Sequence, residues 1–440
     1  MSLYAGVCRT DITPPPGVWM CGYAFRNTGA VGVHDPLNAT AIVFDNGDRR
    51  VGIVSTDLIA LSIELVASIR EKVQAAIGIA PEALMLHCTH THGGPNVAPL
   101  NAMGEYDPAY MSVLERKIVG AFVQASRSML PVRLSAGEAP VQIGINRRQT
   151  LRNGETIIGE NYCGLVDPVV RTLSVNQLSG QPLAVLMHHA CHPTTMEGDN
   201  MLFTSDWPGA AVNRLEARFR EDRDQSLVVI GMLLNGCCGD INPNPRGTWQ
   251  DVERAGNLVG DAAYGARWSS HGTLDDRLLA EEIELQLPLI PPPNTQVCAE
   301  EISKWEKTLA EDIASVAPQG KILFDQAHLD WHKFALTKAD SSEPILKPFK
   351  IQHLNLGGAH LLGFPAEMFV EYQQCFSSLI HAPLFALSYT NGCYGYMPTA
   401  SEHVRGGYEV NEANKYYGAL AFAPECDEMI REAVERMVVG

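Results

Sequence analysis

The stretch VGIVSTDLIALSIELVASIREKVQAAIGIAPEALMLHCTHTHGGP, residues 51–95, alternates two apolar runs with one amphipathic segment. We expect strands at 51–58 and 83–90 and a helix at 62–78, where apolar residues recur with helical spacing. A second helical stretch follows near residues 110–129. This rhythm predicts an α/β fold, a mixed and multilayered arrangement of sheets and helices.

The same pattern of an apolar run ending in polar residues recurs later in the chain. Further strands are expected at LAVLMHH (183–189), SLVVIGMLLNG (226–236), AHLLGFP (359–365) and LFALSYTNG (384–392). Each run ends in a cluster of His, Asn, Gly, Asp or Pro. Ligands of α/β folds usually bind beyond strand ends, so we expect a site built from loops at those ends.

The 440 residues are expected to form a single catalytic domain spanning 1–440. The segment LPLIPPPNTQ starts a region at about 290–347 that contains a charged helix near 300–312 and then a polar stretch. Because the strand pattern resumes after it, we interpret this region as an insertion or surface subdomain.

Charge and composition exclude several classes of partner. The formal charge of −17, from 33 basic and 50 acidic residues without a long basic run, argues against nucleic acid. No window approaches the roughly 18 apolar residues of a membrane span. The odd count of eleven cysteines and a start without a secretory signal predict free thiols in a cytoplasmic protein. With nucleic acid and a membrane span excluded, we expect the partner to be a small-molecule substrate.

Three histidines lie within LHCTHTHGGP, residues 86–95. In an extended segment side chains alternate, so His90 and His92 would share one face and His87 would point to the other. One interpretation is a strand end whose histidines bond to neighbouring carbonyls. The other is a metal site, since imidazole is the commonest metal ligand and the two glycines permit close backbone approach.

A second histidine cluster favours the metal site. His188, His189 and His192 follow the apolar run at 183–186, so six of the 14 histidines lie in two short segments. A shared zinc or similar ion, which takes imidazole nitrogen and carboxylate oxygen from separate loops, would explain this concentration. The spacing leaves open which of the six are ligands.

Other polar clusters have simpler interpretations when taken singly. Asp240 and Asn242 lie in NGCCGDINPNPRG (235–247), which is typical of an Asx turn. Glu367 in LLGFPAEMFVEY (361–372) is expected in the first turn of a helix, where a carboxylate interacts favourably with the helix dipole. Tyr394 and Tyr396 lie in NGCYGYMPT (391–399), which alone indicates only a turn.

Taken in order, these segments resemble the neutral (non-lysosomal) ceramidase family of zinc-dependent amidases. Eight short blocks carry the resemblance: AGVCRTDITPPPG with CGYA (5–17 and 21–24), THTHGGP (89–95), GINRR (144–148), CHPTTM (191–196), TSDWPGAA (204–211), GDINPN (239–244), FPAE (364–367), and YMPT with the later GYE (396–399 and 407–409).

The resemblance implies a role for each matching residue. It makes His90, His192, Glu367 and Tyr396 the zinc ligands, with Tyr396 preferred to Tyr394 by the Tyr-x-x-Thr match. It directs His92 towards the substrate, and it implies that Arg147 contacts the substrate and that Tyr408 is a second active-site tyrosine.

Two departures from the family shape the expected chemistry. Asn242 stands where the family has a catalytic serine, and an amide side chain cannot act as a covalent nucleophile. We therefore expect metal-activated water as the nucleophile, Asp240 to orient a histidine or that water, and Asn242 to donate a hydrogen bond. We also expect no room for the family's C-terminal immunoglobulin-like domain.

The predicted function is a zinc-dependent hydrolase that cleaves an amide, ester or lactone bond in a small polar substrate. One alternative is a metal-dependent lyase or isomerase acting on a sugar or hydroxy acid. Another is a metal-containing binding protein without turnover, against which the retention of His92, Arg147 and Tyr408 argues.

Overall fold

The computed structural model describes residues 2–98, 100–222, 228–269 and 272–439. Its largest sheet has eight strands in the order β12-β10-β9-β6-β1-β3-β4-β5. The pairs β4–β5 and β10–β12 are parallel and the others are antiparallel. The strands are β1 (Tyr4–Asp11), β3 (Asn38–Asp45), β4 (Arg50–Thr56), β5 (Leu84–Cys88), β6 (Leu130–Pro140), β9 (Val169–Gln177), β10 (Pro182–His189) and β12 (Ile230–Asn235).

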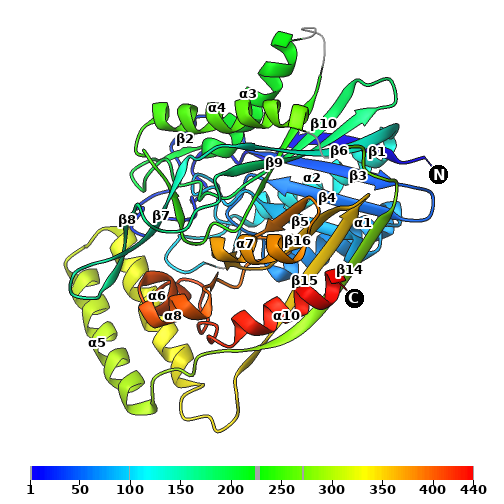
Figure 1. The fold of residues 1–440 in the computed structure, drawn as a ribbon. Coiled ribbons are helices and arrows are strands. Elements are labelled where there is room, and N and C mark those ends of the chain that lie inside the picture. The colour runs from blue at the N-terminus through cyan, green and yellow to red at the C-terminus, as the bar shows by residue number, and fades with distance from the viewer. Residues whose placement is uncertain (1, 99, 223–227, 270–271, 440) are drawn as a thin grey trace.

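Four helices pack on this sheet. α1 (Ile63–Ile77), predicted between β4 and β5, begins where the Ser62 hydroxyl accepts a hydrogen bond from Leu65 N and ends at Gly78. α2 (Pro108–Arg127) packs on β1 and β3. α3 (Asp206–Asp222) and α4 (Trp249–Ala266) pack against each other and above β6, β9 and β12, at the top of the view in Figure 1.

A second sheet has the order β14-β15-β16-β18, and its strands are β14 (Leu278–Pro288), β15 (Leu346–Leu356), β16 (Ala359–Gly363) and β18 (Leu384–Leu387). Leu361 and Leu387 share a hydrophobic core with Val54 and Leu86 of the large sheet. α7 (Val370–Leu379) and α10 (Cys426–Val439) lie in front of this sheet in Figure 1. The layers of helices and sheets confirm the predicted mixed, multilayer α/β fold.

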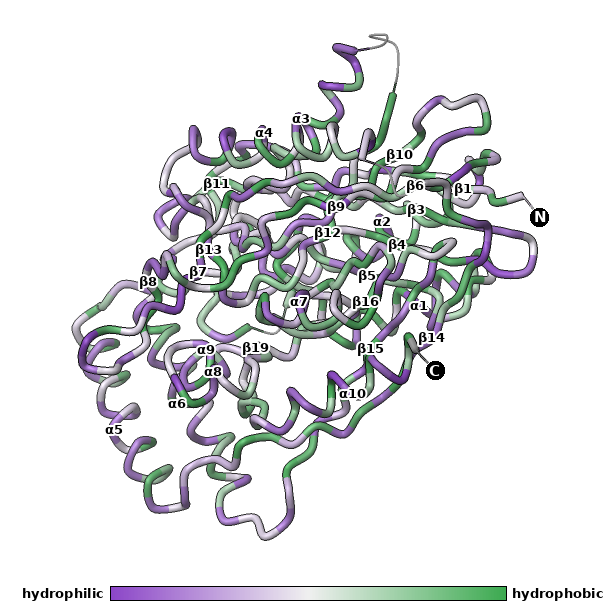
Figure 2. The backbone as a smooth tube through the Cα atoms, viewed as in Figure 1, coloured by the Kyte–Doolittle hydropathy of each residue, from purple (hydrophilic) through white to green (hydrophobic). Residues whose placement is uncertain are grey.

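The region 290–347 lies between β14 and β15, which pair along their whole length. It holds α5 (Thr295–Ala314) and α6 (Gln319–Leu336). The stretch expected to be polar contains α6, which buries Trp331 and Ala335 against Cys298 and Leu420. The interpretation of the region as an insertion or surface subdomain stays a prediction. Figure 2 shows α5 largely in hydrophilic colours, as expected for an exposed helix, whereas hydrophobic colours concentrate in the central strands.

Three small sheets position the polar loops. They are formed by β7 (Gly144–Thr150), β8 (Thr156–Asn161) and β13 (Ile241–Pro243), by β2 (Gly32–Val33) and β11 (Leu202–Phe203), and by β17 (Glu367–Met368) and β19 (Tyr396–Met397). In the last pair the strands are parallel, and Glu367 lies opposite Tyr396. The short helices α8 (Ala400–Arg405) and α9 (Tyr408–Asn411) follow.

Two features bear on the predicted environment of the protein. Within the described ranges, no helix combines the length and apolar composition needed to cross a bilayer. All eleven cysteines of the chain lie in those ranges as free thiols, and seven of them are buried.

Candidate functional site

Seven of the nine predicted site residues lie in segments that follow five strands of the two larger sheets, whereas Arg147 lies in β7 and Tyr408 begins α9. His90 and His92 follow β5, and His192 follows β10. Asp240 and Asn242 follow β12, whereas Glu367 and Tyr396 follow the second sheet's β16 and β18. The site therefore lies beyond strand ends, as the sequence pattern predicted.

His90 reaches the site by a turn and not by strand alternation. β5 ends at Cys88, and His90 has a φ of 69°. The argument that an extended backbone puts His90 and His92 on one face was therefore wrong, although the two side chains do meet, with 3.4 Å between their Nε2 atoms. His90 Nδ1 donates a hydrogen bond to Ile59 O at 2.7 Å, so its Nε2 carries a lone pair.

His192 is held in the same way. Its Nδ1 donates to Cys238 O at 2.6 Å, which leaves Nε2 as an unprotonated nitrogen. That Nε2 atom is buried and makes no hydrogen bond, although Glu367 Oε2 lies 3.1 Å away. A buried nitrogen lone pair that accepts no hydrogen bond is suited to coordinate a metal ion.

Glu367 lies in β17 and not in the first turn of a helix, because α7 starts only at Val370. The helix-dipole interpretation was therefore wrong. Its Oε2 atom is 3.3 Å from His90 Nε2 and accepts a hydrogen bond from Tyr389 at 3.3 Å, while Oε1 accepts one from Tyr417.

The three imidazoles form a cluster suited to a metal ion. One ring nitrogen each of His90, His92 and His192 lies within 4.8 Å of the others. Burial lowers the pKa of His192 to about 4 and that of His92 well below its ordinary value, so both are neutral, as metal ligation requires. The predicted direction of His92 towards the substrate stays a prediction, and the geometry makes it a candidate ligand as well.

Arg147 connects three groups beside this cluster. Its Nε donates to Glu409 Oε1 at 2.8 Å, Nη1 to Asn242 Oδ1 at 3.1 Å and Nη2 to the Tyr396 hydroxyl at 2.8 Å. Glu409 also pairs with Arg148. Arg147 and its three partners are mostly buried. The guanidinium therefore fixes the positions of the Asn242 and Tyr396 side chains.

Asp240 accepts hydrogen bonds from two other elements, and its predicted role in orienting a histidine or the water stays a prediction. One carboxylate oxygen accepts from Val370 N at 2.8 Å, at the start of α7, and the other from Asn146 Nδ2 at 2.9 Å. Burial raises the pKa of Asp240 to about 7. Its contacts make it a positioning residue that ties α7 to β7.

Four residues of the site were not predicted individually. Tyr389 stacks on His90 with 3.8 Å between ring centroids, and Tyr417 and Glu409 make the contacts described above. Gly22 has a φ of 99°, and a Cβ built there would lie 2.5 Å from the His92 ring. Gly22 and Glu409 lie in blocks that carry the family resemblance, but no local pattern pairs them with His92 or Arg147.

These groups open into a cavity of about 380 Å³. Tyr408 contributes to its lining, next to the Tyr396 ring at 6.0 Å between centroids. The lining combines His90 and His92 with apolar and aromatic side chains: Tyr23, Phe25, Ile59, Leu100, Met103, Ile158, Tyr416 and Tyr417. Such a mixture of apolar walls and a few convergent polar groups is typical of a small-molecule site.

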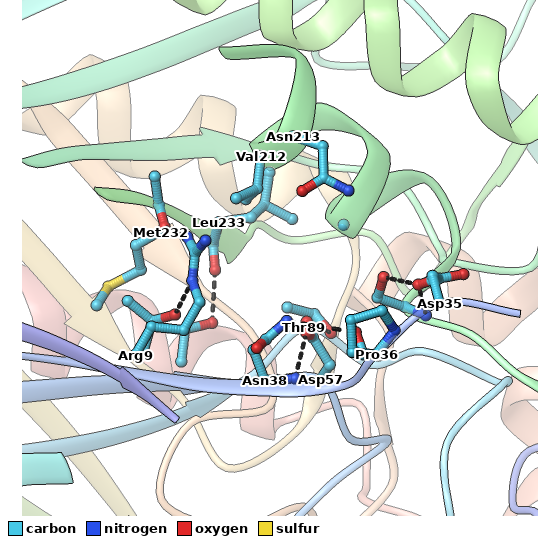
Figure 3. Close-up of a pocket in the computed structure, with 15 residues that line it drawn as sticks. Arg9, Asp35, Pro36, Asn38, Asp57, Thr89, Val212, Asn213, Met232 and Leu233 are labelled. Carbon is cyan, nitrogen blue, oxygen red and sulfur yellow. Dashed lines mark hydrogen bonds between the residues drawn. The ribbon is translucent and has the colours of Figure 1, made fainter. Parts of the chain in front are cut away.

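A second, smaller pocket of about 50 Å³ contains none of the predicted site residues. Figure 3 shows Arg9, Asp35 and Asp57 among its lining, between strands of the large sheet and α3. Asp57 accepts hydrogen bonds from Asn38 N and the Thr89 hydroxyl, and Asp35 accepts from Ser205 N at 2.8 Å. Both acids are engaged by neighbouring groups of the fold.

Comparison with known proteins identifies a family that matches most of the first 267 residues. Residues 3–267, more than half of the chain, match the family model described as neutral/alkaline non-lysosomal ceramidase, N-terminal. This part includes the histidine cluster, Arg147 and Asn242. Glu367, Tyr396 and Tyr408 lie outside it.

Two curated relatives match a similar part of the chain. A neutral ceramidase of Drosophila pseudoobscura pseudoobscura is 27% identical over 256 residues, covering 55% of this chain and 36% of that protein. Neutral ceramidase A of Dictyostelium discoideum is 28% identical over 254 residues, covering 54% and 35%. The match thus spans about a third of each relative's length.

A solved structure extends the likeness to the whole chain. The crystal structure of neutral ceramidase from Pseudomonas aeruginosa aligns with a TM-score of 0.74 at 18% identity, covering 100% of this chain and 74% of that one. At this identity the alignment establishes a shared fold, including the part of the chain beyond residue 267.

Proposed function

The chain belongs to the neutral/alkaline non-lysosomal ceramidase family, and on this basis we propose that it is a zinc-dependent hydrolase of amide bonds. One observation carries the proposal. The Nε2 atoms of His90 and His192 lie 3.3 and 3.1 Å from one carboxylate oxygen of Glu367, at a cavity large enough for a small substrate. The relatives are named ceramidases, and ceramide is an N-acyl amide.

The residues present fit a divalent cation. His192 Nε2 is buried without a hydrogen bond, and the Nδ1–H groups of His90 and His192 each donate to a backbone carbonyl. Glu367 supplies a negatively charged oxygen ligand. We assign His90, His192 and Glu367 as ligands, with His92 and Tyr396 as candidates for a further position. Zinc held there would supply hydroxide near neutral pH and would polarise the scissile carbonyl.

The protein's own groups would then orient the amide and stabilise charge. Arg147 holds the Asn242 amide by its Oδ1 atom, which leaves Nδ2 as a donor at the cavity wall. Asn242 has no ionisable proton, so the acyl group is not transferred to this side chain. The Tyr408 hydroxyl and His92 line the same cavity. In this proposal they would donate hydrogen bonds to the oxyanion that forms from the carbonyl.

The reaction itself tests the proposal. Zinc-loaded protein is incubated in H₂¹⁸O with a panel of short-chain acyl amides, esters and lactones, and the carboxylate product is analysed by mass spectrometry. Hydrolysis predicts one ¹⁸O atom in the new carboxylate and loss of turnover after chelation. Products formed without water oxygen would identify a lyase or isomerase, and metal binding without turnover would favour the binding protein.

A further inference from the structure

The cavity is lined by two kinds of residue besides the metal cluster. Ile59, Leu100 and Met103 belong to one small hydrophobic cluster and give the cavity an apolar part. Thr194 and Arg246 come from the loops that carry His192 and Asn242 and give it a polar part. The metal cluster and the Arg147 network use neither Thr194 nor Arg246, so these two side chains need another explanation.

Arg246 places a charged fork at the cavity. Its ion pair within the described part of the chain is to Glu197, with 3.6 Å between Nη2 and Oε1, longer than a hydrogen bond. The two side chains are 36% and 54% exposed, and a solvated pair of this length contributes little to stability. The guanidinium therefore keeps hydrogen-bonding capacity for a ligand in the cavity.

Thr194 is a second residue of this cavity whose side chain lacks a hydrogen-bond partner. Its side chain is only 4% exposed, and its Oγ1 atom is buried without a hydrogen bond. Buried hydroxyls in folded proteins nearly always have a partner, because an unpaired one has lost its hydrogen bonds to water without replacement. Since Thr194 lines the same cavity as Arg246, a ligand there could satisfy both groups.

On the basis of the proposed amide hydrolysis, we propose that the substrate is an N-acyl amino acid whose carboxylate is bound by Arg246 and Thr194. The acyl chain lies against Ile59, Leu100 and Met103. Among the described residues that line the cavity, Arg147 is engaged by Glu409, Asn242 and Tyr396, which leaves Arg246 as the arginine available to a substrate anion away from the metal cluster. One guanidinium matches a monoanion better than a phosphate dianion. The planar guanidinium also matches the two oxygens of a carboxylate.

The reaction is then a balanced hydrolysis. Water adds to the acyl carbon, the carbon–nitrogen bond breaks, and a proton passes to the departing nitrogen. The products are a carboxylic acid and a free amino acid, whose carboxylate stays unchanged throughout. Arg246 thus acts in substrate selection and takes no part in bond breaking.

Three matched amides test the carboxylate contact. N-hexanoyl-alanine, N-hexanoyl-alaninamide and N-hexanoyl-ethylamine share the acyl chain and differ in the group offered to Arg246. With zinc-loaded full-length protein, kcat/KM from amine release is expected to be about 10- to 100-fold higher for the carboxylate, the range that a charged hydrogen bond contributes. Equal values for the three amides would overturn the inference.

Variants assign the preference to one side chain. Arg246→Ala is expected to bring the ratio of kcat/KM for N-hexanoyl-alanine over its amide to about one, and Arg246→Lys to retain part of it. Arg116→Ala, at an exposed position on α2, is the matched control and should keep the wild-type ratio. A ratio that survives in Arg246→Ala would contradict the assignment.

Binding separates this inference from the proposed function. If no amide is hydrolysed, the proposed function fails, yet calorimetric titration of the zinc-loaded protein with N-hexanoyl-alanine and N-hexanoyl-alaninamide still tests the site. Tighter binding of the carboxylate that is lost in Arg246→Ala supports the inference. Equal affinities would overturn it.

Discussion

The histidine cavity and the small pocket beside Asp57 are both polar and largely buried, but they satisfy their polar groups differently. In the small pocket Asp35 and Asp57 accept hydrogen bonds from nearby backbone and hydroxyl groups (Figure 3). In the larger cavity the buried Oγ1 atom of Thr194 has no hydrogen-bond partner, and the same holds for Nε2 of His192 in the adjoining histidine cluster. The comparison indicates that unsatisfied groups aimed into a cavity mark a functional site, whereas satisfied ones stabilise the fold.

The largest expected effect comes from the carboxylate of the metal cluster. Glu367→Gln keeps the shape of the side chain but removes the charge that faces His90 and His192. We expect kcat/KM to fall about a thousandfold or more, on the order of the loss of a charge-stabilising group. Amide hydrolysis by zinc-loaded protein measures it, with Glu300→Gln on exposed α5 as the control. Retained activity would contradict the assignment of the histidine cavity as the functional site.

Arg147 tests whether the network beside the metal cluster also holds the fold together. Arg147→Met removes three hydrogen bonds and leaves buried Glu409 with Arg148 as its remaining cation. Loss of a partner from a buried ion pair costs about 3–5 kcal/mol, and we expect the lower end because Arg148 remains. Urea unfolding compares it with Arg116→Met on the surface of α2. An unchanged free energy of unfolding would contradict a structural role.

Asp57 sharpens the comparison from the structural side. Burial, with a smaller contribution from Asp35, raises the pKa of Asp57 to about 7, although Asn38 N, Arg9 and the Thr89 hydroxyl act to lower it. The folded state therefore holds this proton more tightly than the unfolded state. This contribution to stability is present below the unfolded pKa of about 4 and is lost as pH rises through about 7.

The substitution Asp57→Asn removes that titration. The wild type should lose stability between pH 5 and pH 8, and the variant should not. The free energy of unfolding of the variant minus that of the wild type should therefore increase by about 2–3 kcal/mol over this range. Chemical denaturation at the two pH values measures the difference, with exposed Asp48→Asn as the control. Parallel pH profiles for wild type and Asp57→Asn would refute the titration.

Asn242 should show the smallest effect. Asn242→Ala removes a donor at the cavity wall but no ligand, so we expect about a tenfold loss of kcat/KM, the size of one hydrogen bond, with zinc content unchanged. Asn153→Ala at an exposed turn serves as the control. A variant of Asn242 that lost its zinc would show that the side chain supports the metal site instead.

The sequence predicted the features that depend on local pattern. Residues 51–95 fold as the expected strand, helix and strand, since apolar spacing and the Ser62 cap determine them locally. The sheet order places β5 and β10 far apart, but β12, the parallel neighbour of β10, contacts β5 where Asn235 N donates to His87 Nε2 at 3.0 Å. This contact brings the histidines that follow β5 and β10 together. Family resemblance, and not spacing, singled out His90 and His192 among six candidates.

What the sequence could not predict depends on contacts between distant segments. His90 turns to the cluster through a positive φ, which strand alternation does not anticipate. Tyr389 and Tyr417 reach Glu367 from loops whose approach only the packing of the second sheet defines. Likewise, Trp331 of α6 packs against Leu420, which is distant in sequence. The mixture of polar and apolar residues in α6 does not indicate this contact.

The metal content of the purified protein tests the central claim most directly. After zinc reconstitution and removal of free metal, elemental mass spectrometry should find about one zinc per chain in wild type and in the exposed control His381→Ala. His90→Ala and His192→Ala, shown to be folded by circular dichroism, should each hold far less. Wild-type protein that binds no zinc, or variants that keep the full amount, would contradict the metal site on which the account depends.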